Sequence, residues 1–260
     1  MSDDIKIKNE KEIALMRQAG KIVAEILRIL IKQMKPGMIT KELDIIAERE
    51  LKRLGAESSF KDYRGYPANI CVSVNDEIVH GIPGDRVLKE GDIVSLDFGA
   101  VYHGFHGDAA VTVPVGEVSP EAKLLIEATR DSLEKGIAAA QAGAKLGDIS
   151  AAIQSYAESK GYSLVRKYTG HGIGRKLHED PQIPNTTEPP YGLQPGTGPV
   201  LQKGMTLALE PMLNVGGWRT RTADDQWTVL TADGSLSAHF EHTIAIDDTE
   251  PEVLTRGTYA

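Results

Sequence analysis

Two acidic residues end apolar segments of the same pattern in the two halves of the chain. The first segment reads GDIVSLD and ends at Asp97, and the second reads GMTLALE and ends at Glu210. Both ends of the segment repeat after 113 positions (204−91 and 210−97). A buried carboxylate without a partner is costly, and a bound metal ion is a common compensation. The repeat therefore indicates a duplicated carboxylate site for metal ions.

A second acidic pair follows the first. Asp108 begins the segment DAAVTV and Glu241 begins EHTIAI, 133 positions later (241−108). A hairpin that turns near Tyr102 and His103 would place Asp97 directly opposite Asp108, with Cβ atoms roughly 4.5–5.5 Å apart. Carboxylates at that separation repel each other unless a cation lies between them. A lone Asp after a strand is usually a turn residue, but repetition at matched spacing favours a metal site.

His171 in the segment TGHGIG is the candidate fifth ligand. The flanking Gly170 and Gly172 would permit a strained backbone and a close approach to a crowded site. Oxygen ligands with one imidazole suit Mn, Fe, Co or Zn better than Ca or Mg, and four acids suggest two ions. The segment also resembles a phosphate-binding glycine loop, but that interpretation is weak because no helix with a Lys follows. His178 and Glu179 resemble part of a zincin motif, but that motif needs a second His four residues after the first, and the chain has none there. The histidines expected to be exposed or to pack are His103, His106 and His239.

Repeated helices and strands must position these side chains. Apolar periodicity predicts helices over residues 10–34, 40–55, 121–140 and 148–159. Thr40 is the expected N-cap of the second helix. Each half thus runs helix, helix and then acid-bearing strands, which predicts an α+β fold with helices packed on an antiparallel sheet. We expect residues 1–260 to form one domain, with pseudo-two-fold halves at roughly 10–116 and 120–250.

Three other segments have the composition of connections. Residues 114–119 are the expected turn between the halves, and residues 181–199 are rich in Pro and Gly, which predicts a loop. Residues 214–237 are expected to form an irregular insert, because the two acid pairs repeat at different spacings.

The composition limits the classes of function. The net charge of −8 disfavours a general nucleic-acid-binding role, which needs a basic surface. The single cysteine, Cys71, forms no internal disulfide and suits a reducing compartment such as the cytoplasm. The sequence shows neither an apolar targeting segment nor a stretch that could span a bilayer.

Longer motifs connect these residues to a known family. The chain contains DYRGYPANICVSVNDEIVHGIPG, SLDFGAVYHGFHGDAAVTV, YTGHGIGRKLHE, LALEPML and HFEHT. It closely resembles the type I, bacterial-type methionine aminopeptidases, which are metallopeptidases of the pita-bread fold. The resemblance implies duplicated halves with a curved antiparallel sheet covered by helices. It also implies two divalent ions (Co, Mn, Fe or Zn) held by Asp97, Asp108, His171, Glu210 and Glu241, with Asp108 and Glu241 bridging them.

The resemblance also implies a reaction and its residues. The reaction is hydrolytic removal of the N-terminal initiator methionine from nascent proteins and peptides, with a preference for a small second residue (Gly, Ala, Ser, Thr, Cys, Pro or Val). Glu210 would shuttle a proton, His178 would contact the scissile amide, and His80 would contact substrate beside the metals. The residues implied to line the methionine pocket are Tyr63, Tyr66, Cys71, Leu177 and Trp227. Each aromatic residue alone would fit ordinary core packing equally well.

Two departures and two rival functions accompany this resemblance. Leu177 stands where the family has a phenylalanine, and the loop over residues 184–200 is longer than expected. A proline-specific aminopeptidase or dipeptidase would need a further N-terminal domain, and a non-catalytic binding module would tend to lose ligands. The expected enzyme is a monomer that acts on nascent chains without membrane or sequence-specific nucleic-acid binding. Transient ribosome contact would suit it, although no basic cluster indicates such contact.

Overall fold

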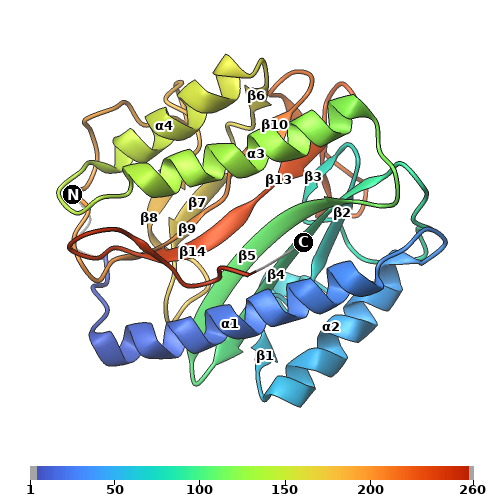
Figure 1. Ribbon diagram of the computed structural model, residues 1–260, viewed down its shortest axis with the longest axis horizontal. Coiled ribbons are helices and arrows are strands. Elements are labelled where there is room, and N and C mark those ends of the chain that lie inside the picture. The colour runs from blue at the N-terminus through green and yellow to red at the C-terminus, as the bar shows by residue number, and fades with distance from the viewer. Residues whose placement is uncertain (1–4, 258–260) are drawn as a thin grey trace.

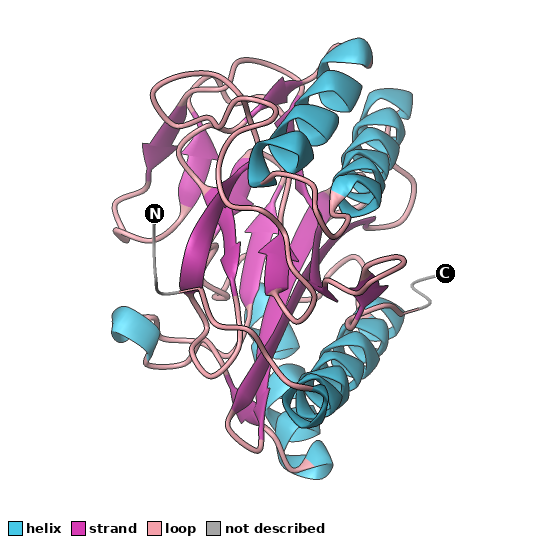
Figure 2. Cartoon of the chain, turned by 90° about the vertical axis from the view of Figure 1, so that its left-hand side faces the viewer, coloured by secondary structure: helices cyan, strands magenta, loops and turns pink. Residues whose placement is uncertain are grey.

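Four α-helices and a broad antiparallel sheet make up most of residues 5–257, the part of the chain that the computed structural model describes (Figure 1). The helices lie against one face of the sheet, and loops cover much of the other face (Figure 2). The helices are α1 (Glu10–Gln33), α2 (Thr40–Leu54), α3 (Pro120–Ala139) and α4 (Leu146–Ser159). All four predicted helices are confirmed within two residues at each end.

Local sequence signals explain where the helices begin and end. The Asn9 side chain caps α1 by accepting hydrogen bonds from two first-turn amides. The Glu12 carboxylate in turn accepts a hydrogen bond from the Asn9 backbone amide. Gly55 ends α2 in the left-handed conformation at φ 66°. The predicted N-cap of α2 is wrong, because Ile39 occupies that position. The Thr40 hydroxyl instead donates a hydrogen bond to the Gly84 carbonyl and accepts one from the Gly84 amide. These two bonds hold the start of α2 against the loop that contains Gly84.

The main sheet has nine strands in the described part of the chain, with the central order β1-β4-β5-β14-β9-β7-β8. The strands of that order are β1 (Glu57–Ser58), β4 (Ile93–Tyr102), β5 (Phe105–Pro114), β14 (Glu241–Ala245), β9 (Thr206–Leu209), β7 (Thr169–Gly172) and β8 (Glu179–Pro184). In addition, β2 (Cys71–Val74) pairs with β4, and β15 (Glu252–Val253) pairs with β14. One smaller sheet joins β13 (Ser237–His239), β10 (Met212–Asn214) and β6 (Ser163–Leu164).

The repeated acidic segments occupy equivalent places in the sheet. The first half contributes the hairpin β4–β5, and the second half contributes the pair β9–β14. These two pairs join through β5 and β14 at the centre of the sheet. The repeat seen in the sequence therefore brings four acid-bearing strands side by side.

Two segments expected to lack regular structure contain strands. Residues 179–184 form β8 at the sheet edge, where Pro181 is tolerated because an edge strand has donors that need no partner. The expected insert contains β11 (Thr220–Thr222) and β12 (Val229–Thr231), which form a sheet with β3 (Glu77–Val79). The rest of both segments is irregular, and the predicted turn at residues 114–119 joins β5 to α3.

The apolar core lies between the helices and the sheet. Leu27 of α1, Leu43 of α2, Leu96 of β4 and Ile153 of α4 have no exposed surface. Each fully buried side chain of this size contributes about 1.5–3 kcal/mol relative to an exposed one. The core thus packs against the face of the sheet that is turned toward the helices, and the acids lie on the opposite face. Within residues 5–257, no helix combines the length and apolarity that a membrane crossing requires.

Candidate active site

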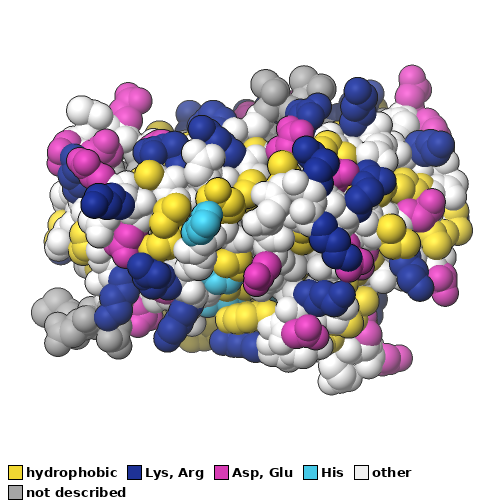
Figure 3. Space-filling model, turned by 90° about the horizontal axis from the view of Figure 1, so that it is seen from below, with side chains coloured by type: hydrophobic (Ala, Val, Ile, Leu, Met, Phe, Trp, Pro, Cys, Tyr) yellow, Lys and Arg dark blue, Asp and Glu magenta, His cyan; other side chains and the backbone are white. Residues whose placement is uncertain are grey.

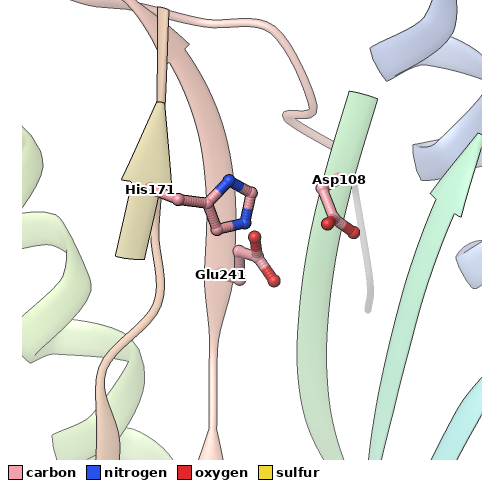
Figure 4. Close-up of side chains that lie close together, drawn as sticks. All are labelled: Asp108, His171 and Glu241. Atoms are coloured by element: carbon pink, nitrogen blue, oxygen red, sulfur yellow. The ribbon is translucent and has the colours of Figure 1, made fainter. Parts of the chain in front are cut away.

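Five neighbouring strands bring the five predicted metal ligands to one place. Asp97 lies on β4, Asp108 on β5, Glu241 on β14 and His171 on β7, while Glu210 directly follows β9. These strands are consecutive in the sheet order β4-β5-β14-β9-β7. Figure 4 shows Asp108, His171 and Glu241 with side chains directed toward a shared space.

The hairpin register differs from the predicted one by two residues. Asp97 pairs with Ala110 and Asp108 pairs with Gly99, so the two acids are diagonal rather than opposed. The cause is the turn, where His103 and Gly104 both have positive φ, at 48° and 78°. Because side chains alternate with period two, a shift of two residues leaves both acids on the same face.

The distances among the ligand atoms suit a shared cation. One ligand atom each from Asp108, His171 and Glu241 lies within 4.8 Å of the others. Glu210 is next to this group, with its Oε1 at 3.7 Å from His171 Nε2. Asp97 lines the same cavity as these four residues and is buried.

The donor atoms pass a test of fit for a divalent ion. Asp97 Oδ1, Asp108 Oδ1 and Glu241 Oε1 are buried and have no hydrogen-bond partner in the described chain. Buried polar atoms are nearly always paired, so three orphaned carboxylate oxygens in one cavity need a cationic partner. His171 Nδ1 lies 2.9 Å from the Gly172 carbonyl, which assigns the ring proton to Nδ1 and leaves Nε2 free as a ligand.

Burial and mutual repulsion dominate the electrostatics of the cavity. Burial raises the pKa of Asp97 to about 7. Burial, with repulsion from neighbouring carboxylates, raises the pKa values of Asp108, Glu210 and Glu241 well above their ordinary range. Burial lowers the pKa of His171 to about 4, so its imidazole is neutral near pH 7. Metal binding therefore has to release protons from the acids but not from the histidine.

The glycines on either side of His171 allow neighbouring backbone segments to pack closely, and they do not adopt unusual backbone angles. Neither Gly170 nor Gly172 has a positive φ, so the expected strained backbone is wrong at both positions. A Cβ on Gly170 would lie 2.4 Å from the Ala208 carbonyl oxygen, and one on Gly172 would lie 2.1 Å from the Asp180 carbonyl oxygen. Only glycine lets the adjacent chains pack this closely.

We expect Gly172→Ala to lower the free energy of unfolding by about 1–3 kcal/mol, the usual cost of overpacking. Its kcat/KM should also fall, because β7 carries His171 and must move away from the Asp180 carbonyl. Gly84→Ala is the matched control, since its new Cβ would meet no atom closer than 4.0 Å. Denaturant unfolding and steady-state kinetics of the two variants make the comparison. Equal stability of the two variants would contradict the close-approach argument.

Two further histidines stand beside the ligand group. The His178 ring lies 4.3 Å from the His171 ring between centroids, and its Nδ1 is 2.8 Å from the Tyr63 hydroxyl. His80 is held edge-on against Trp227 at 6.4 Å. Burial, with repulsion from His171, lowers the pKa of His178 to about 3, and burial lowers that of His80 to about 4. Both rings are therefore neutral hydrogen-bonding groups near pH 7.

A cavity of about 150 Å³ collects every residue predicted for the site. Its lining includes Tyr63, Tyr66, Cys71, His80, Asp97, Asp108, His171, Leu177, His178, Glu210, Trp227 and Glu241. Phe60 and Arg64, which the sequence did not single out, complete it. The long loop packs elsewhere, through hydrogen bonds from Gly147 to Thr197 and from Gly196 to Asp148 at the start of α4.

His239 lies beside the ligand group, where the sequence prediction did not place it. It was expected to be exposed or to pack, yet it is 1% exposed and lies among the acids. His239 Nε2 is 3.9 Å from Glu210 Oε2 and 4.0 Å from Glu241 Oε2. A usable signal existed, because His239 lies two residues before Glu241 and alternation places both side chains on one face.

Comparisons with known proteins agree with this geometry. The profile of metallopeptidase family M24 matches residues 14–248. The chain is 54% identical to methionine aminopeptidase 1 of Bacillus subtilis, over 96% of this chain and 98% of that protein. The crystal structure of methionine aminopeptidase from Thermotoga maritima matches with a TM-score of 0.93 and 50% identity, over 97% of this chain and 99% of that one.

A more distant neighbour shows how far the fold extends. Xaa-Pro dipeptidase from Bacillus anthracis matches with a TM-score of 0.77 and 26% identity, and the match covers 98% of this chain but 63% of the dipeptidase. The helices, the antiparallel sheet and these neighbours identify the pita-bread fold, as predicted. The chain belongs to metallopeptidase family M24 and, within it, to the methionine aminopeptidases.

Proposed function

We propose that this chain hydrolyses the peptide bond after an N-terminal methionine in nascent proteins and peptides. The observation that carries the proposal is the convergence of five ligand-type side chains on one end of a small cavity with largely apolar walls. Near-complete matches to methionine aminopeptidases support the same activity. Residues 1–260 would act as one catalytic domain built from the two repeated halves.

Two divalent ions would bind to Asp97, Asp108, His171, Glu210 and Glu241. Asp108 and Glu241 lie on the paired strands β5 and β14, and their ligand atoms lie within 4.8 Å of each other and of a His171 ring nitrogen, so these three residues would hold metal together. Mixed carboxylate and imidazole donors favour Co, Mn, Fe or Zn. When bound, such ions supply hydroxide near neutral pH and stabilise developing negative charge.

The protein's own groups would orient the substrate and move the proton. Glu210 is the proposed proton shuttle toward the leaving amine, since its carboxyl group lies at the edge of the ligand group. The Tyr63 hydroxyl would donate to His178 Nδ1, so that His178 carries its proton on Nε2 and donates it toward the scissile amide. His80 would contact the substrate beside the ligand group.

The walls of the cavity suit the methionine side chain. Tyr66, Cys71 and Leu177 are buried and present apolar surface, and Trp227 packs edge-on against Tyr66 with ring centroids 5.1 Å apart. An unbranched thioether fits a narrow cavity of about 150 Å³ better than a branched or charged side chain does. The Cys71 thiol would serve as part of the wall, because burial raises its pKa well above the ordinary value. A reducing compartment such as the cytoplasm would preserve it.

Methionine release from short peptides tests the function. With added Mn, Fe, Co or Zn, we expect release from Met-Ala-Ser and at least roughly tenfold slower release from Met-Leu-Ser, because a close-fitting site excludes the larger second residue. N-acetylated Met-Ala-Ser and an Xaa-Pro peptide should not be cleaved. Chromatographic detection of free methionine makes the measurement. Absence of release from Met-Ala-Ser under every metal would overturn the proposed function.

A further inference from the structure

We propose that a basic cleft outside the metal cavity binds acidic residues at the third and fourth positions of the substrate. This inference rests on the proposed function, because the cleft leads away from the bond to be cleaved. Its volume is about 550 Å³, and its lining includes Lys6, Arg64 and Lys176.

The cleft is continuous with the metal cavity. Arg64, His171 and His178 line both spaces, so the two meet at these side chains. A substrate whose N-terminal methionine occupies the cavity must direct the rest of its chain outward. The shared boundary at His178, the proposed donor to the scissile amide, makes the cleft the path for the following residues.

The charges of the cleft favour an anionic ligand. Lys6, Arg64 and Lys176 are exposed, and none of them has an ion pair within 4.0 Å in the described chain. Of the two acids in the lining, Glu179 is paired with the buried Lys8 at 2.6 Å, which leaves Asp180. The cleft is therefore positive on a chain whose net charge is −8. Figure 3 shows a face on which Lys and Arg side chains gather on several sides of exposed histidines.

The backbone holds two of these cations at defined positions. Arg64 is the central residue of the turn η1 (Tyr63–Gly65) and has a φ of 52°, an uncommon value for a non-glycine residue. Its guanidinium lies 5.4 Å from the centre of the Tyr63 ring, and Tyr63 in turn contacts His178. Lys176 precedes Leu177, and its amide donates to Glu179 Oε1. Both cations are thus placed by the same segments that build the site.

Three peptides of one length test the proposal on the full-length, metal-loaded chain: Met-Ala-Asp-Asp-Ser, Met-Ala-Ser-Ser-Ser and Met-Ala-Lys-Lys-Ser. Exposed ion pairs change affinity by about two- to fivefold each at low salt. We expect kcat/KM for the acidic peptide to exceed that for the basic one by roughly five- to twentyfold, mainly through KM. Moderate salt should reduce the difference by screening the charges.

Charge reversal locates the effect. Arg64→Glu and Lys176→Glu should each lower the acidic-to-neutral ratio of kcat/KM, and the double variant should invert the preference. Lys123→Glu, an equal charge change on the exposed surface of α3, should leave the ratio unchanged. Ratios within one variant remain informative when that variant has lower overall activity. Lys176→Met is a milder replacement that removes the charge without adding an acid.

Binding separates failure of the cleft from failure of the function. Calorimetric Kd values of the same peptides on the Glu210→Gln variant require no hydrolysis. Methionine release at equal rates from the three peptides, together with equal Kd values, would overturn the proposed role of the cleft but not the proposed function. Charge-dependent binding that Lys176→Glu abolishes, without release from any peptide by the parent chain, would support the cleft and overturn the function.

Discussion

The Glu210→Gln variant is expected to lose roughly 10²- to 10⁴-fold in kcat, the usual contribution of a general acid–base group. The Glu210 carboxyl group lies 3.7 Å from His171 Nε2 and 3.9 Å from His239 Nε2, and the side chain is 14% exposed. Burial and the charges of Asp97 and Asp108 raise the pKa of Glu210 well above its ordinary value. Glutamine keeps the side-chain volume but cannot shuttle a proton.

Metal content decides how that loss is interpreted, because Glu210 is also a proposed ligand. Steady-state kinetics should be measured at saturating metal, with the bound metal quantified on the same sample. Glu50→Gln is the matched control, since Glu50 is a buried glutamate on α2 that is paired with Arg53 and is not part of the cavity lining. Turnover within a few-fold of the parent at full metal occupancy would remove Glu210 from proton transfer. Glu210→Ala should lose at least as much activity while the fold persists.

The convergence of the predicted ligands on one cavity could be expected from the sequence, because the information was local and repeated. Asp97 and Glu210 stood out because each ends an apolar segment, and Asp108 and Glu241 because each begins one, with a constant spacing within each pair. An error of two residues in the hairpin register did not matter, since every second side chain of a strand faces the same side. The helices were equally clear, because their apolar stripes and end signals lie within each segment.

Features that depend on tertiary neighbours were harder to predict. The closeness of His239 to Glu210 follows from the pairing of β13 with β10, because the two-residue spacing from Glu241 indicates only that the two side chains share a face. Residues 179–184 contain prolines and suggested a loop, yet their place at the sheet edge allows a strand. The basic cleft was missed because Lys6, Arg64 and Lys176 are far apart in sequence and meet only through the fold.

Metal removal is expected to abolish activity while leaving most of the secondary structure intact. The core between helices and sheet buries apolar side chains from every layer and does not pass through the ligand cavity. A core of this size can support the fold without metal. Activity and far-UV circular dichroism should therefore be recorded before and after chelation. Global unfolding caused by the chelator would contradict this expectation.

The chelated protein should also become less stable as the pH rises through about 7, the pKa of Asp97 in the fold. Asp97, with a pKa of about 7, and the other three acids, whose pKa values burial and mutual repulsion raise well above their ordinary range, keep protons in the fold that the unfolded chain has already released. A raised carboxyl pKa gives stability at low pH that is lost as the pH rises through the folded value. Each excess proton corresponds to about 1.4 kcal/mol per pH unit.

The pH range matters because buried histidines act in the opposite direction below it. Burial lowers the pKa values of His171 and His239 to about 4 and about 3, so acid favours the unfolded chain below pH 6.5. Above pH 7 these rings are largely neutral in both states, so they no longer oppose the effect of the acids. Asp108→Asn should flatten the slope of the chelated protein, whereas Glu50→Gln, outside the cavity, should retain it. Denaturant midpoints that rise with pH in the chelated parent would show that the four acids are not held protonated in the fold.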